Sequence, residues 1–291
     1  MAFPNNGVVE APAIVPSAFG LLDFAKPENS ADEDVWIRGF SQEWETTATS
    51  LKNWDDTDST SSTLIVNGVI NYYDEIKPFF IEIDETRSTL GFLGIDRIAR
   101  LKRQMEGATQ HAMEHELWNG TVREGETHDN RSLTSSSSTI LNSGTALSAR
   151  RALALLEHSI GIASHFGEQG VIHVTRDVAS LLASNSNMLF HEKGKDHLQT
   201  FGGTPVIVGS GYSGNGPDGA TGAAASATNK WIYATGTVRT YVGNIDVVND
   251  NLSQAYDVSG NANDMRMKAI RPAAVYFDTS IHLAVRVDLT A

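Results

Sequence analysis

The residues best suited to chemistry are two histidines and a glutamate on one predicted helix. His111, Glu114 and His115 fit the pattern H-x-x-E-H, which is typical of one class of zinc peptidase. A spacing of four residues puts both imidazoles on one helical face, where they can share a metal ion. A third protein ligand would have to come from farther along the chain, and His115 also continues an apolar stripe where a core or interface histidine would sit. A zinc hydrolase that uses His111 and His115 therefore stays an alternative.

A glycine-rich segment offers a second chemical possibility. Residues 209–214 fit G-x-G-x-x-G and follow a predicted strand, as a dinucleotide site requires. The chain continues as NGPDGATG, so no apolar helix follows whose N-terminus would face a pyrophosphate. The segment is therefore predicted to be a mobile surface loop, and no cofactor is expected.

Composition narrows the classes of function. The 291 residues include no cysteine, which excludes disulfides, thiolate metal sites and cysteine nucleophiles. With 22 basic and 35 acidic residues the formal charge is −13, which argues against broad phosphate binding. No stretch has the roughly 18 apolar residues that cross a bilayer, and the start of the chain lacks a secretory signal. We expect a protein made in the cytosol, with no membrane partner, no metal and no catalytic residue.

The first fifty residues or so are predicted to form an extended arm. They contain four prolines, acidic clusters and several aromatic residues, which disordered tails usually lack. We expect contact to order the arm, either with a neighbouring subunit or with its own domain. Its aromatic residues include Phe24, Trp36, Phe40 and Trp44.

Two strand signals precede the first long helix. Asn67-Gly68 separates two short β-branched runs, which is a strong hairpin signal. The following segment, PFFIEID, alternates so that Phe79, Ile81 and Ile83 share one face of a strand. A β-rich excursion therefore comes before the helix.

The clearest element is a helix predicted from about Leu93 to Trp118. Apolar residues recur there every three or four positions, and Asn119-Gly120 is the stop signal. The first half is basic and the second acidic, opposite to the order that the helix dipole favours, so we expect these charges to meet partners elsewhere. The apolar stripe comprises Ile98, Leu101, Met105, Ala108 and Ala112, and the basic half includes Arg97, Arg100 and Arg103.

The rest of the chain mixes helices and strands without a repeated βαβ rhythm. A helix is predicted from about Ala146 to His165, a strand over Val171–Val174, and a short helix after Thr175. Strands follow at TPVIVG and WIYATGTVRTYV, and the last segment, AVYFDTSIHLAVRVDL, reads as a strand with one buried face. The predicted class is mixed α+β.

Four segments carry a resemblance to a known family. They are PFFIEIDETRSTLGFLGIDRIARL, AMEHELWNG, TFGGTPVIVGSGYSGNGPDG, and NKWIYATGTVRTYVGNIDVV followed by AVYFDTSIHLAVRVDL, and together they span residues 78–291 in order. The chain resembles major capsid proteins of tailed bacteriophages, most closely those of phages that infect actinobacteria, which adopt the Hong Kong 97 type of fold. An encapsulin-like compartment protein, which shares that fold, is the nearer alternative.

The resemblance implies a division of the chain. The expected parts are an N-terminal arm at 1–49, an extended β-hairpin loop at 50–85, a peripheral domain at 86–145 with its spine helix at about 93–118, an axial domain at 146–245, a returning peripheral segment at 246–270, and a C-terminal axial strand at 271–291.

The resemblance also implies a structural function without catalysis. Such subunits form pentamers and hexamers that build an icosahedral shell around double-stranded DNA, without sequence-specific binding, in the cytoplasm of a bacterial host. A portal protein and a separate scaffolding protein are expected partners, and the virion capsid is the expected location. Because aromatics dominate interface energetics, the candidate contacts between subunits are Phe24, Trp36, Phe40, Trp44, Trp54, Tyr72 and Tyr73, together with Arg97, Arg100 and Arg103.

Some relatives cross-link a loop lysine to an asparagine of a neighbour. Lys52 and Lys77 lie in or near the predicted hairpin, but no sequence motif identifies a partner asparagine or a catalytic carboxylate. Covalent cross-linking is therefore a hypothesis for denaturing electrophoresis of mature particles, where monomer-sized bands alone would end it.

Overall fold

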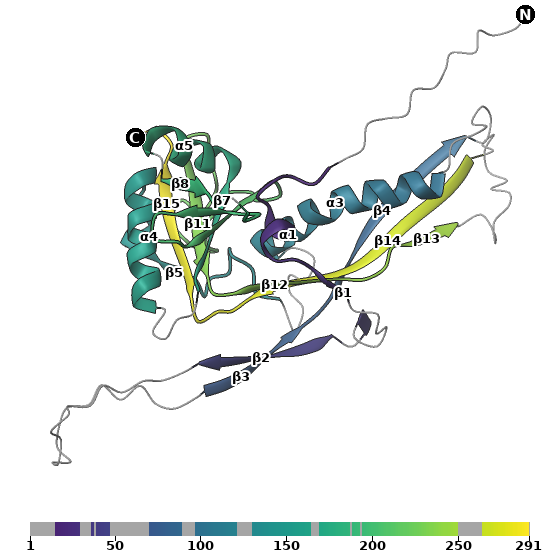
Figure 1. Ribbon diagram of the computed structural model, residues 1–291, viewed down its shortest axis with the longest axis horizontal. Coiled ribbons are helices and arrows are strands. Elements are labelled where there is room, and N and C mark those ends of the chain that lie inside the picture. Colours follow the sequence, from purple (N-terminus) through teal and green to yellow (C-terminus); the bar gives the residue numbers. More distant parts are fainter. Residues whose placement is uncertain are drawn as a thin grey trace, which may run out of the picture.

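The computed structural model describes residues 15–29, 36–37, 39–46, 70–88, 97–120, 130–163, 169–186, 188–192, 194–249 and 264–290. Two sheets with their helices form two lobes, and a separate two-stranded ribbon extends away from them (Figure 1). The mixed α+β class predicted from the sequence is confirmed. No helix in these ranges is both long and apolar enough to cross a membrane.

The first lobe is built on an eight-stranded sheet. Within it β7 (Val171–Thr175) and β10 (Pro205–Gly209) run parallel, with α5 (Arg176–Ser186) between them in the chain. The sheet order is β5-β15-β11-β7-β10-β9-β8, and β6 also pairs with β15. The remaining strands are β5 (Thr139–Ile140), β6 (Leu147–Ser148), β8 (Leu189–His191), β9 (Leu198–Thr200), β11 (Asn229–Thr235) and β15 (His282–Asp288).

Both faces of the central strands of this sheet, β7, β10, β11 and β15, are largely buried. The helices α4 (Ala149–Ala163) and α5 cover one face, where Leu153, Leu156 and Val285 belong to a single apolar cluster. On the other face Trp231, Tyr233 and Ala284 join a second cluster. The expectation of a last strand with one buried face is therefore wrong, because β15 is an inner strand whose second face is covered by other parts of the chain.

The second lobe is a five-stranded sheet that carries the long helix α3 (Arg97–Asn119) (Figure 1). Its central strand, β14, pairs along one edge with β12 and then β13, and along the other with β4. In β4 Phe79 and Ile81 are buried while Phe80 is exposed, as the alternation predicted. The strands are β1 (Glu28–Asn29), β4 (Phe79–Ser88), β12 (Val238–Val242), β13 (Asp246–Asn249) and β14 (Asp264–Phe277).

Two neighbouring chain crossings join the lobes. The chain passes from β11 to β12 at Gly236, and from β14 back to β15 through Asp278 and Ile281. The Gly236 N–H donates to Asp278 O at 3.1 Å and Ile281 O at 3.0 Å, and the Asp278 N–H donates to Thr237 O at 2.9 Å. We call these residues the neck, because the two crossings are hydrogen-bonded to each other where the sheets meet.

The third sheet is the ribbon of β2 (Phe40–Thr46) and β3 (Ile70–Ile76), which are antiparallel. Its register places Trp44 opposite Tyr72. The predicted turn at Asn67-Gly68 lies outside the described residues.

Strand pairing crosses the boundaries expected from sequence at four places. Phe40–Thr46, expected within the arm, pairs with β3 in the ribbon, and β4, which begins within the loop expected at 50–85, pairs in the five-stranded sheet. β12 also lies in that sheet, although 146–245 was expected to be axial. The fourth difference is β14, which runs without interruption across the expected boundary at 270–271. Pairing with distant strands decides each case, and local pattern does not report it.

Candidate functional site

Glu114 is the centre of a junction between three distant parts of the chain. The residue is 0% exposed on α3. Its Oε2 accepts from the N–H groups of Ser210 at 2.6 Å and Gly211 at 2.9 Å, and from Ser210 Oγ at 2.9 Å. Its Oε1 accepts from the Leu21 N–H at 3.0 Å and from Gln110 Nε2 at 3.0 Å. The carboxylate therefore ties α3 to the N-terminal segment and to the loop after β10.

The N-terminal segment, residues 15–29, packs against both lobes of its own chain. Gln110 Nε2 donates to Ser17 O at 2.9 Å, and the Val208 N–H of β10 donates to Phe19 O at 2.9 Å. Thr240 Oγ1 then donates to Ala25 O at 2.8 Å, and β1 pairs with β12. The sequence left open whether the arm packs on a neighbouring subunit or on its own domain, and residues 15–29 pack on their own chain.

The histidines of the H-x-x-E-H pattern are not assembled into a metal site. His111 and His115 are exposed, and His111 Nδ1 lies 3.4 Å from Ser210 Oγ. Glu114 points into the junction and has its acceptors occupied. Across the described ranges, no three His, Cys, Asp or Glu side chains are grouped to hold a metal ion. Of the core or interface position expected for His115, the core position is wrong, because the residue is exposed. Leu101 and Met105 of the predicted stripe are buried, whereas Ile98 is exposed.

The prediction of a surface loop at residues 209–214 is wrong. Gly211 lies against the backbone of α3, where an added Cβ would be 2.3 Å from His111 O and 2.8 Å from His115 N. Tyr212 is buried, and its ring lies 4.6 Å from that of Trp118, centroid to centroid. The glycines therefore permit close packing. The next element after β10 is the strand β11, so no helix follows the loop, as the sequence indicated when it argued against a dinucleotide site.

A buried aromatic cluster continues from this loop. Trp118 Nε1 donates to Asn215 O at 3.1 Å, and the Tyr233 hydroxyl donates to the same oxygen at 3.0 Å. Burial raises the pKa of Tyr233, with the nearby Asp218 carboxylate adding to the shift. The end of α3 and strand β11 are thus joined through one loop carbonyl.

A buried histidine links the same loop to the neck. Thr235 Oγ1 donates to Gly236 O at 3.0 Å, so its oxygen accepts at 2.9 Å from His173 Nε2. That assignment leaves His173 Nδ1 as the acceptor of the Tyr212 hydroxyl, also at 2.9 Å. Burial, assisted by His282, lowers the pKa of His173 to about 3. The histidine is therefore neutral, both of its ring nitrogens are hydrogen-bonded within the chain, and its role is structural.

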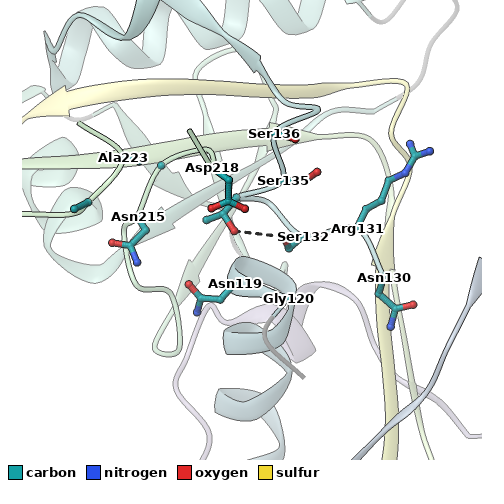
Figure 2. Close-up of a pocket in the computed structure, with 13 residues that line it drawn as sticks. Asn119, Gly120, Asn130, Arg131, Ser132, Ser135, Ser136, Asn215, Asp218 and Ala223 are labelled. Atoms are coloured by element: carbon teal, nitrogen blue, oxygen red, sulfur yellow. Dashed lines mark hydrogen bonds between the residues drawn. The ribbon is translucent and has the colours of Figure 1, made fainter. Parts of the chain in front are cut away.

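A polar pocket of about 500 Å³ lies between the end of α3, residues 130–136 and residues 215–224 (Figure 2). Several lining groups are bonded within the chain. Thr134 Oγ1 donates to Trp118 O at 3.0 Å and contacts Ser132 Oγ at 3.3 Å, and Asn119 Oδ1 accepts from Ser213 Oγ at 2.9 Å. Figure 2 shows the side chains of Asp218 and Arg131 apart from each other. The pocket lies where several segments meet, and its lining residues do not form a group of side chains arranged for catalysis.

Two of the candidate contact residues pack on their own chain. Phe24 is partly buried, with its ring centroid 5.2 Å from that of His197. Trp36 is buried in a small cluster with Ile76 and Tyr276. Little of the Trp36 side chain is left to face a neighbouring subunit.

The other candidates remain predictions. Phe40 and Trp44 lie in β2 and Tyr72 and Tyr73 in β3, so the structure brings these four positions together in the ribbon. Arg97 begins α3, with Arg100 partly exposed and Arg103 exposed farther along it. Trp54 lies outside the described residues.

One prominent surface feature escaped the sequence patterns. Phe201 is 93% exposed in the turn after β9, and Phe190 in β8 is 41% exposed beside it, with ring centroids 6.5 Å apart. The signal available was a lone phenylalanine before Gly202-Gly203, which has no helical or strand periodicity to reveal its exposure.

Comparisons with known proteins rest on structure alone, because no family model matches the sequence and no curated protein matches it. The structure of the capsid of a native GTA particle, computed with C5 symmetry, is similar with a TM-score of 0.58 at 11% identity, covering 99% of this chain and 95% of that one.

Two phage structures give comparable values. That of Mycobacterium phage Adephagia has a TM-score of 0.56 at 10% identity, covering 99% of this chain and 94% of that one. The capsid of Ralstonia phage GP4 has a TM-score of 0.54 at 10% identity, covering 99% and 97%. Nothing in these likenesses favours an encapsulin or a zinc hydrolase. The chain therefore has the Hong Kong 97 type of fold found in tailed-phage capsid proteins.

Proposed function

We propose that the protein is the major capsid protein of a tailed bacteriophage. The observation that carries this proposal is the likeness to the GTA capsid protein, which covers 99% of this chain and 95% of the other and leaves no large unmatched domain on either side. Fold alone does not fix function. Here, however, the likeness extends over 99% of this chain and 95% of the other, so it is not confined to one part of the subunit.

Copies of the chain form pentamers and hexamers and close an icosahedral shell around double-stranded DNA. Closed rings of one subunit require head-to-tail contacts, in which different surfaces of the subunit meet. The β2–β3 ribbon, which extends away from both lobes in Figure 1, supports such contacts because it reaches beyond the subunit's own core. The formal charge of −13 suits a wall that encloses DNA without gripping it.

The protein carries out no catalysis. Its buried polar groups, including Glu114 and His173, are bonded to other parts of the chain and are not presented to a substrate. Assembly takes place in the host cytoplasm with a separate scaffolding protein and a portal protein, and the product is the virion capsid.

Expression with and without the phage's other structural proteins tests this function. Rings, shells or tubes that sediment ahead of the subunit on a gradient, and that negative-stain electron microscopy resolves, are the expected result. A protein that stays monomeric at high concentration with scaffold supplied would overturn the proposal.

A further inference from the structure

We infer that Phe201 and Phe190, here called the aromatic patch, form a docking surface for a second copy of this chain. This inference rests on the proposed function and deepens it, because it names a surface through which subunits meet. A phenylalanine that is 93% exposed leaves nearly all of its apolar area in water. Covering such a ring is favourable at about 25 cal/mol per Å² of apolar area.

The turn that presents Phe201 is held firmly. Thr200 Oγ1 donates to Glu157 Oε1, and Thr204 Oγ1 donates to Glu157 Oε2 at 3.0 Å. The backbone closes the turn as well, with Thr200 N donating to Thr204 O at 2.9 Å and Gly203 N to Thr200 O at 3.0 Å. Gly203 has a φ of +85°, which a side chain would disfavour. An aromatic ring on such a turn loses little entropy on binding, as in interface anchors.

The hairpin behind the patch is braced by the N-terminal segment. The ring of Phe19 lies 5.2 Å from that of His191 and the ring of Phe24 lies 5.2 Å from that of His197, both edge to face. In the described part of the chain β8 pairs with β9 alone, so the other edge of β8 ends the eight-stranded sheet. An open sheet edge beside exposed aromatics is a surface that proteins cover by association.

Charge around the patch makes a second copy of this acidic chain an acceptable partner. Glu192 pairs with Lys195 at 2.7 Å, and Asp196 pairs with Lys26 at 3.2 Å. Two acidic and two basic side chains thus neutralise one another at the rim. Copies that each carry a formal charge of −13 can approach there without the repulsion expected elsewhere. A ring of such copies places the patch against a different surface of its neighbour.

Substitutions at Phe201 test the inference in the full chain expressed with its scaffold. Phe201→Ser is expected to fold normally, because its ring is exposed, and to lower shell yield by about tenfold or more since the contact repeats in every subunit. Phe201→Leu keeps an apolar side chain and is expected to retain most of the yield. The matched control is Ile162→Ser, which removes a 58% exposed side chain from α4 and is expected to leave assembly unchanged.

Hydroxyl-radical footprinting gives a readout that needs no variant. Phe190 and Phe201 should be protected in shells and reactive in free subunits. Normal assembly of Phe201→Ser, or full reactivity of both rings in shells, would overturn the inference while the capsid function stands. Protection that disappears when the scaffold leaves would also overturn it, by assigning the patch to the scaffold. Failure of the wild type to assemble would instead remove the proposed function, and this inference with it.

Discussion

Glu114 Oε2 accepts the backbone N–H of Gly211 at 2.9 Å, which joins the long helix to a loop 97 residues away in the chain. Oε1 of the same carboxylate accepts the N–H of Leu21 at 3.0 Å, 93 residues away in the other direction. One side chain therefore sets where the N-terminal segment and the glycine-rich loop sit on α3. The stability of the subunit should depend on it strongly.

Glu114→Gln is expected to destabilise the free subunit by about 2–4 kcal/mol, because an amide NH₂ would face backbone N–H donors in a buried site. Urea unfolding followed by circular dichroism measures the change. His115→Gln, an exposed neighbour on the same helix, is the control and should lie within about 0.5 kcal/mol of wild type. Equal stability of Glu114→Gln and the control would show that the junction contributes little.

Gly211→Ala tests the close approach of the loop to α3. The added methyl would lie 2.3 Å from His111 O, so loop or helix must move, at an expected cost of about 1–3 kcal/mol. Gly161→Ala in α4 is the matched control, since nothing lies within 4 Å of its added Cβ and alanine favours helices by about 1 kcal/mol. The midpoint temperature of thermal unfolding should fall for Gly211→Ala and rise for Gly161→Ala. A shift in the same direction for both would contradict the close packing of Gly211 on α3.

His173 should make the subunit sensitive to acid. Its pKa is about 3 in the folded protein, against an ordinary value of 6.5, so below pH 6.5 the unfolded chain binds a proton that the folded chain does not. The contribution of His173 to the free energy of unfolding is therefore fully present above pH 6.5. It falls as the pH drops toward 3, by up to about 1.4 kcal/mol per pH unit. His282, whose pKa burial lowers to about 4, adds a loss in the same direction.

Unfolding free energies at pH 7.5 and 5 measure this loss. His173→Gln removes the titrating group and should reduce the difference between the two pH values, while the same change at the exposed His158 serves as the control. A difference that is the same in wild type and His173→Gln would contradict the assignment of the acid sensitivity to His173.

The neck offers a test of how the lobes are joined. An added methyl at Gly236 would lie 2.8 Å from Asp278 Cβ and 3.0 Å from Asp278 O, so Gly236→Ala must separate the two chain crossings. We expect a loss of about 1–3 kcal/mol and faster hydrogen exchange at the Asp278 amide, which is bonded to Thr237 O. Unchanged exchange at Asp278 would mean that the crossings are not coupled.

Local pattern predicted elements well and their partners poorly. The long helix and the alternation of Phe79, Phe80 and Ile81 follow from periodicity, and the structure contains both. The charges of this helix were expected to meet partners elsewhere, and Glu114 does, but the sequence did not identify those partners, which lie more than ninety residues away in either direction. No local rule reports such contacts.

The glycine-rich loop and the arm also show that sequence pattern does not identify packing partners. Glycines at 209–214 are compatible with an exposed turn or with tight packing, and the choice depends on the α3 backbone that Gly211 contacts. Trp36, a candidate contact between subunits, packs in a cluster with Ile76 and Tyr276 of its own chain. Aromatic residues in an arm predict burial without saying against which surface.

Electron cryomicroscopy of particles assembled from this chain and its scaffold tests the central claim most directly. The account predicts closed shells with five-fold vertices, in which each density unit fits the two lobes joined at Gly236 and Asp278. A chain that remains monomeric under those conditions, or that forms only irregular aggregates, would contradict it.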